Sequence, residues 1–221
     1  MQKKQKAELL YERLVARYPD ATCSLVFQNP LQLLVATQLS AQCTDKQVNK
    51  VTPGLFEILQ TASDFAQIEL ETLERLIHST GFYKNKAKNI QAACKLLVTE
   101  FGGVVPVDME ALLRLPGVGR KTANVVRAEA FGLPGIVVDT HVGRIAKRIG
   151  LTKQDDPNKV EHDLMKLLVD SKWNKLCHVL IEHGRETCTS RNPKCSDCVV
   201  SDLCDLYRSG FFNGSSHFIR T

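Results

Sequence analysis

LPGVGRKTANVV, at residues 115–126, combines a proline and two glycines with the start of a helical pattern. Pro116 stops one helix, and Gly117 and Gly119 turn the chain directly into a second. Two glycines allow the backbone to approach a phosphate closely, while the free N–H groups at the start of the second helix point outward to bind it. The stretch therefore predicts a helix–hairpin–helix that grips phosphate. A purely structural αα-hairpin is the alternative, and the basic neighbours of the glycines disfavour it.

The two helices of this hairpin have recognisable ends. Asp108 is expected to cap the first helix, which continues through MEALLRL. The second helix, KTANVVRAEAF, is expected to end at Gly132 and Pro134. Together these signals place the whole motif at about 108–131.

Helical periodicity also dominates the rest of the chain. Apolar residues at helical spacing, separated by Pro, Gly, Asn and Asp, predict helices over 4–18, 30–42, 55–61, 70–80, 86–100 and 140–150. The helix that Pro30 opens is apolar on most sides, which predicts a buried core helix. No strand-period alternation persists, and IVV at 136–138 is too short to found a sheet. The fold class is therefore all-α.

Composition narrows the class of protein only slightly. The chain has 221 residues, 43% of them hydrophobic and 24% charged, which is ordinary for a globular protein of one or two domains. No apolar run approaches the length of a membrane span. The net charge of +5 is mild, but residues 83–95, 114–128 and 141–153 carry four, four and four cations and no acid. These windows suit phosphates, although each alone could be a solvated helix face.

Four cysteines stand close together near the C-terminus, in the spacing C-x6-C-x2-C-x5-C: Cys188, Cys195, Cys198 and Cys204. Their segment is polar and short of bulky apolar residues, so metal ligation must supply the free energy that orders it. The spacing suits either one Zn ion or an iron–sulfur cluster. Disulfides are disfavoured, because the charged MQKKQKAE start indicates a cytoplasmic protein.

Two further residues could carry chemistry. Lys121 falls in the first turn of the second hairpin helix, where the positive end of the helix dipole disfavours a cation and so favours the neutral amine of a nucleophile. Asp139 is expected to cap the helix that ends at Gly150. Its carboxylate could also face a developing positive charge. A phosphate-binding lysine and a plain capping aspartate are the simpler interpretations.

Taken together, the motifs resemble endonuclease III, the iron–sulfur DNA glycosylase/AP lyase family of the helix–hairpin–helix superfamily. The similar stretches are QLSAQCTD (38–45), GFYKNKAKNI (81–90), LPGVGRKTANVV (115–126), VDTHVGR (138–144), HGRETC (183–188) and the cysteine quartet. They follow the family order over about residues 20–206. The resemblance implies that the quartet holds a [4Fe–4S] cluster, and that Lys121 and Asp139 are the catalytic pair of base excision repair at oxidised pyrimidines in duplex DNA.

The resemblance also implies roles in DNA binding. Gln42 matches the residue that fills the gap left by a flipped base, and Phe82 matches a wedge position where an aliphatic residue is usual. Gly143, with His141, lies at a base-pocket position that is bulkier in the prototype, which implies a roomier pocket. The phosphate contacts implied are those of the hairpin and of the cysteine loop: Gly117, Val118, Gly119, Arg120, Arg191 and Lys194.

The resemblance implies two helical lobes with Lys121 and Asp139 facing each other across a cleft. Residues 22–133 would form a six-helix domain with the hairpin, and residues 1–21 with 134–207 an iron–sulfur cluster domain. Residues 208–221 would be a tail without assigned function. We expect a cytoplasmic, nucleoid-associated monomer that acts on double-stranded DNA with an oxidised pyrimidine or an abasic site. A monofunctional glycosylase for another lesion and a non-catalytic DNA-binding protein remain alternatives.

Overall fold

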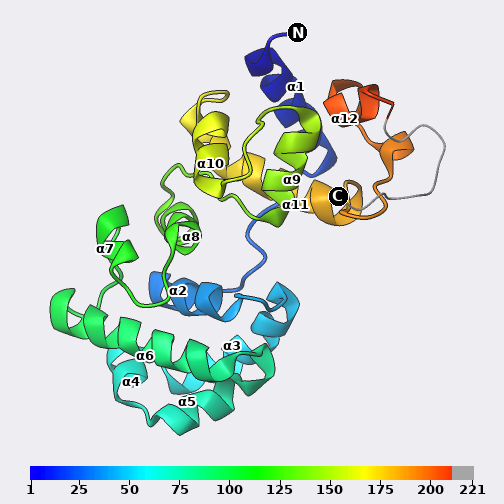
Figure 1. Cartoon of the computed structure of the whole chain (residues 1–221). Coiled ribbons are helices and arrows are strands. Elements are labelled where there is room, and N and C mark those ends of the chain that lie inside the picture. The colour runs from blue at the N-terminus through cyan, green and yellow to red at the C-terminus, as the bar shows by residue number, and fades with distance from the viewer. Residues whose placement is uncertain (211–221) are drawn as a thin grey trace. The chain divides into compact units, whose positions relative to one another are not determined.

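The computed structural model describes residues 1–210, so most of the expected tail lies outside the described residues. The chain divides into two compact units (Figure 1). We call residues 23–133 the hairpin unit, and residues 1–22 with those from 134 onward the cysteine unit. All regular structure in the described residues is helical, which confirms the all-α prediction. None of these helices is long and apolar enough to cross a membrane.

The hairpin unit contains seven α-helices and one short 3-10 helix, where six helices were expected. They are α2 (Pro30–Leu39), α3 (Asp45–Ile58), α4 (Ala62–Gln67), α5 (Leu70–Ile77), η1 (His78–Thr80), α6 (Tyr83–Glu100), α7 (Met109–Leu113) and α8 (Arg120–Phe131). The expected helix 55–61 is wrong at both ends. Thr44 caps α3 ten residues earlier than predicted, because Pro53 is accommodated inside the helix. Thr61 instead begins α4, through a capping box with Asp64.

The cysteine unit is built from α1 (Lys3–Arg17), α9 (Thr140–Ile149), α10 (Pro157–Met165), α11 (Trp173–Glu186), α12 (Asp205–Arg208) and three single-turn 3-10 helices: η2 (Asp170–Lys172), η3 (Cys195–Asp197) and η4 (Ser201–Leu203). The apolar stripe of α1 is buried, as its spacing predicts. Lys6 on the same helix donates hydrogen bonds to the Ile149 carbonyl at 2.9 Å and to Asp205 Oδ1 at 2.5 Å. Helix α1 is thereby tied to the end of α9 and to α12.

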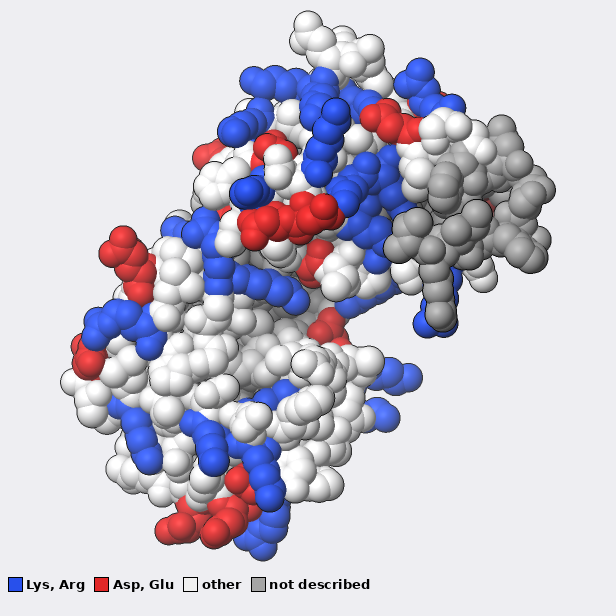
Figure 2. Space-filling view, in the orientation of Figure 1, with Lys and Arg blue, Asp and Glu red and all other residues white. Residues whose placement is uncertain are grey.

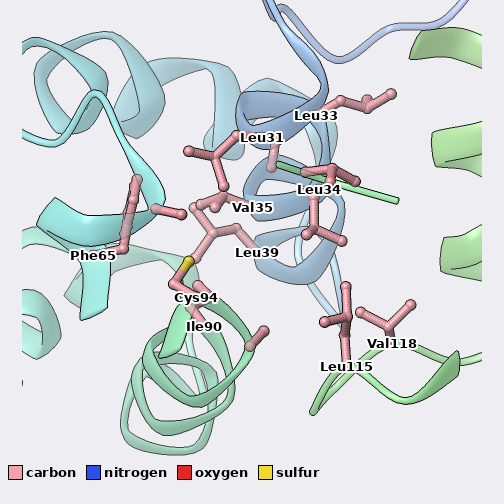
Figure 3. Packing of buried hydrophobic residues seen from close by; sticks show 14 of the residues in the cluster. Leu31, Leu33, Leu34, Val35, Leu39, Phe65, Ile90, Cys94, Leu115 and Val118 are labelled. Atoms are coloured by element: carbon pink, nitrogen blue, oxygen red, sulfur yellow. The ribbon is translucent and has the colours of Figure 1, made fainter. Parts of the chain in front are cut away.

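The hydrophobic core of the hairpin unit surrounds α2, whose side chains are buried on nearly all sides, as predicted. Figure 3 shows Leu34 and Leu39 of α2 among side chains from several other elements, including Phe65, Ile90 and Leu115. Each fully buried side chain of this kind contributes about 1.5–3 kcal/mol relative to an exposed one. Because Leu115 belongs to the hairpin, the core itself fixes where the hairpin lies.

Two contacts hold the hairpin turn against neighbouring helices. Gln38 of α2 donates from Nε2 to the Pro116 carbonyl at 3.1 Å. Gly117 has a φ of +75°, and a Cβ at this position would lie 2.8 Å from Cβ of Asn89 on α6. Gly119 has a φ of −92° and open space around a Cβ. Only the first glycine of the pair is therefore required by backbone conformation and packing.

We predict that Gly117→Ala lowers the free energy of unfolding of the hairpin unit by about 1–3 kcal/mol, because it combines a left-handed backbone with a close contact to Asn89. Gly119→Ala is the matched control and should cost less than about 1 kcal/mol. Denaturant unfolding of both variants measures the difference. Equal losses would show that the turn does not depend on Gly117.

Candidate functional site

The four clustered cysteines lie around one small cavity in the cysteine unit. The cavity, of about 20 Å³, is lined by all four of them together with Arg148 and His183. No group of three or more His, Cys, Asp or Glu in the described residues has the arrangement of a single-ion site. The four thiols nevertheless face a common space, and thiolates are the ligands that iron–sulfur clusters use. The donor set therefore fits a cluster.

Two arginines of α9 hold the loop that carries the first cysteine. Arg148 donates from Nη1 to Cys188 Sγ at 3.3 Å and to the Thr189 carbonyl at 2.7 Å, and from Nη2 to the Ser190 carbonyl at 2.9 Å. Arg144 donates from Nη2 to the Cys188 carbonyl at 2.9 Å. An arginine provides a planar array of N–H donors, which a lysine does not.

A buried polar group from α11 lies on another side of the cavity. His183 is 1% exposed, and its Nε2 lies 3.6 Å from Cys198 Sγ. Its Nδ1 lies 3.4 Å from the Tyr18 hydroxyl, which is 3.2 Å from the Thr187 hydroxyl. Burial lowers the pKa of His183 to about 4, so the ring is neutral at neutral pH. These contacts connect Cys198 with α11 and with Tyr18 at the C-terminal end of α1.

Without a bound metal, burial makes three of these thiols weaker acids than usual. It raises the pKa of Cys198 to about 11 and raises the pKa of Cys195 and Cys204 above the usual thiol value, with the neighbouring cysteines adding to each shift. Without a metal these side chains are protonated at neutral pH. Ligation must therefore release protons, and the metal charge must offset the cost of burying thiolates.

Three of the six predicted DNA-binding residues of the hairpin unit line a second cavity, of about 240 Å³, whereas Val118, Gly119 and Arg120 do not. Gln42, Phe82 and Gly117 line it, as does Thr122, the neighbour of Lys121. Gln42 and Phe82 have φ angles of 52° and 48°, and they are the only residues other than glycine with positive φ in the described chain. The Phe82 side chain is 63% exposed. The structure thus brings these residues together at the end of α2, before α6 and at the hairpin.

The two candidate catalytic residues each lie at the start of a helix. Lys121 is exposed on the first turn of α8, and the N-cap residue of this helix, Gly119, makes no side-chain cap hydrogen bond. Asp139 is half-buried and caps α9, as predicted, by accepting a hydrogen bond at Oδ1 from Val142 N at 2.8 Å. The cap uses one carboxylate oxygen, which leaves the other for a partner.

The remaining candidates lie in the cysteine unit. Arg191 and Lys194 are exposed on the loop between the first two cysteines. His141 packs closely against Gly184 of α11, and its Nδ1 lies 3.2 Å from Arg144 Nη2. At Gly143 a Cβ would meet only Cγ1 of Val138, at 3.7 Å. The position therefore has room for a larger side chain at its base.

The acid-free windows overstate the positive surface. In residues 83–95 Lys86 is buried, and in residues 141–153 Arg144 and Arg148 point to the cysteine loop. Lysine and arginine side chains are still spread over the surface of each unit that Figure 2 shows. The number of lysines and arginines in a window does not predict which side of a helix each one faces, so the inward-facing cations were not predicted. Lys86 lies on the same buried side of α6 as Ala87, Ile90 and Cys94. The helical spacing of these apolar residues in the sequence could therefore have predicted that Lys86 is buried.

Comparisons with known proteins identify the class and then the family. Residues 35–169 match the HhH-GPD superfamily of base excision DNA repair proteins, and residues 188–204 match the iron–sulfur binding domain of endonuclease III. The second match begins and ends at the outer two cysteines. The class is therefore a helix–hairpin–helix base excision repair protein with an iron–sulfur domain.

Whole-chain similarity narrows this class further. Endonuclease III of Synechocystis sp. is 55% identical over 91% of this chain and 93% of its own, and that of Bacillus subtilis is 44% identical over 90% and 92%. A solved structure described as a trapped endonuclease III–DNA covalent intermediate has a TM-score of 0.90 and 45% identity, covering 96% of this chain and all of that one. The chain belongs to the endonuclease III family. It is a DNA glycosylase and AP lyase, and it carries a [4Fe–4S] cluster.

We predict that Cys198→Ser abolishes cluster retention, because it removes one thiol from the shared cavity. The purified variant should lack visible absorbance and bound iron. Trypsin should cut its polar loop at Arg191 or Lys194 much faster than in the wild type, since little apolar burial holds that loop. Cys23→Ser, in the hairpin unit, is the control and should keep its iron. Full iron content in Cys198→Ser would refute the ligand assignment.

Proposed function

We propose that Lys121 is the nucleophile and Asp139 the charge-stabilising carboxylate of a bifunctional DNA glycosylase/AP lyase that removes oxidised pyrimidines from duplex DNA. The observation that carries the proposal is the position of Lys121, exposed on the first turn of α8 directly after a phosphate-gripping turn. A phosphate held by the hairpin N–H groups would place the adjacent sugar within reach of the amine. The covalent intermediate described for a solved relative supports a lysine nucleophile.

The reaction follows from these groups. The damaged nucleotide leaves the base stack, because its glycosidic bond is out of reach inside the duplex. Neutral Lys121 Nζ attacks C1′, and the base departs with the electrons of the glycosidic bond. Asp139 stabilises the positive charge that develops on the sugar. The C1′–O4′ bond then breaks, O4′ takes up a proton, and a Schiff base forms between C1′ and Lys121. Loss of a proton from C2′ drives β-elimination, in which the C3′–O3′ bond breaks and the 3′ phosphate leaves with its electrons. Water finally hydrolyses the Schiff base and frees Lys121.

Other residues serve binding rather than chemistry. Gln42 would fill the gap left by the displaced base, and Phe82 would stack on the orphaned partner base, since an exposed ring offers a face that any base can cover. Arg191 and Lys194 would contact phosphates from the cysteine loop. When bound, the cluster would cross-link that loop through its four cysteines. The protein would act as a monomer on chromosomal DNA in the cytoplasm.

We predict that borohydride traps a covalent adduct between the wild-type protein and an abasic-site duplex, and that Lys121→Ala forms none. Lys50→Ala removes an exposed lysine elsewhere in the hairpin unit and should trap normally. Asp139→Asn should keep its helix cap but excise the base at least about 100-fold more slowly, because it loses the negative charge.

Two outcomes would contradict this assignment. Base release by the wild type without any trapped adduct would support a monofunctional glycosylase. DNA binding with neither adduct nor base release from thymine glycol, dihydrouracil or other lesion duplexes would support a non-catalytic binding protein.

We predict that Gly143→Phe changes the order in which oxidised pyrimidines are excised, because the bulky ring would occupy space that glycine leaves open. Gly143→Ala is the control and should leave the order unchanged. It should raise the free energy of unfolding by about 0.5–1 kcal/mol, since alanine is the better helix former. Single-turnover excision rates on thymine glycol and dihydrouracil duplexes measure the order. An unchanged order in Gly143→Phe would exclude Gly143 from the base pocket.

A further inference from the structure

The most unusual charged side chain of the hairpin unit is Lys86 on α6. It is only 6% exposed, and its ammonium donates to the Leu39 carbonyl at 2.7 Å and to the Thr80 carbonyl at 2.8 Å. Burial lowers its pKa, an effect that nearby Cys43 partly opposes. Its hydrogen bonds thus go to two neutral carbonyls from separate helices. A buried charge held in this way is poor evidence of a stabilising role, because an apolar side chain of similar size commonly packs as well.

The two carbonyls define what Lys86 connects. Leu39 is the last residue of α2, and Gln42 follows it by three residues. Thr80 is the last residue of η1, and Phe82 follows it by two. One ammonium therefore joins the ends of the two helices from which these turns depart.

Those turns are also the strained ones. Gln42 and Phe82 adopt left-handed backbone conformations, which residues other than glycine rarely adopt. Such conformations persist only where the surrounding structure holds them. Lys86 lines the same cavity as both residues. It is therefore well placed to hold both turns at a fixed spacing.

We propose that Lys86 is a positioning residue for base displacement: by bonding the ends of α2 and η1, it fixes the spacing of Gln42 and Phe82 before DNA binds. The inference rests on the proposed function, in which these two residues replace and cover bases. If Lys86 has this role, its loss should slow only the reaction that requires displacement of a base. A damaged base must be displaced from the stack, whereas a preformed abasic site has no base to displace.

The test compares two reactions of the same full-length, cluster-containing protein under single turnover. Lys86→Met keeps the length of the side chain and removes its donors. Excision from a duplex with thymine glycol opposite adenine should slow at least about ten-fold, while cleavage of a preformed abasic-site duplex should slow less than about three-fold. Leu97→Ala is the matched control on α6, since it removes a fully buried side chain far from both turns. It should change the two rates by the same factor.

A second comparison tests whether Lys86 acts through Gln42 and Phe82. In a Gln42→Ala/Phe82→Ala background, Lys86→Met should change the excision rate less than two-fold, because nothing remains to be positioned. If Lys86→Met does not fold, Lys86→Arg, which keeps the charge and the donors but alters their spacing, should show the same selective loss of excision.

Three results would overturn the inference: equal losses in the two reactions, no loss in either, or a full effect of Lys86→Met in the Gln42→Ala/Phe82→Ala background. A wild-type protein that neither excises thymine glycol nor forms a trapped adduct would instead reject the proposed function itself. The two failures are thus distinguishable.

Discussion

The loop of residues 187–204 has too little apolar surface to order itself, and the rest of the cysteine unit is arranged around that constraint. Val200 and Leu203 are its buried apolar side chains, and its four cysteines are half-buried. The remaining support is polar. Arg148 binds two carbonyls and one sulfur of the loop, and His183 lies against another sulfur. Because these partners come from α9 and α11, the order of the loop and the order of the unit are coupled.

The hairpin unit meets a different requirement. The hairpin turn, which we propose binds phosphate, is anchored by the hydrophobic core through Leu115 and Val118, and by a hydrogen bond from Gln38. Gln42 and Phe82, which we propose displace and cover bases, lie in turns with a left-handed backbone, and the buried Lys86 connects the helices before these turns. The core of this unit needs no metal. A metal-dependent unit and a metal-independent unit thus contribute Asp139 and Lys121, respectively, to one proposed reaction.

Local signals predicted much of this arrangement. The caps at Asp108 and Asp139, the buried helix after Pro30 and the left-handed turn at Gly132 follow from residue chemistry that tertiary packing does not override. The start of α3 was not predicted, because Pro53 and Gly54 are residue types that usually separate helices, and this helix accommodates both. Short helices such as α4 carry too few turns for periodicity to show.

The site was less predictable than the fold. The cysteine spacing indicated a shared metal centre, but it gave no sign that Arg144 and Arg148 would support the loop. Whether a basic residue faces solvent or a carbonyl depends on helical phase and on contacts with distant segments. The positive φ of Gln42 and Phe82 had no local signal either, because neither residue type is typical of that conformation.

The cluster is expected to order the cysteine unit, whereas the hairpin unit is ordered by its own hydrophobic core. Hydrogen–deuterium exchange, measured with the cluster bound and after its removal by oxidation and chelation, tests this most directly. We expect that loss of the cluster accelerates exchange in residues 187–204 and in the adjoining parts of α9 and α11, while α2, α6 and α8 keep their protection. Unchanged exchange in residues 187–204, or an equal loss of protection in α2, α6 and α8, would contradict it.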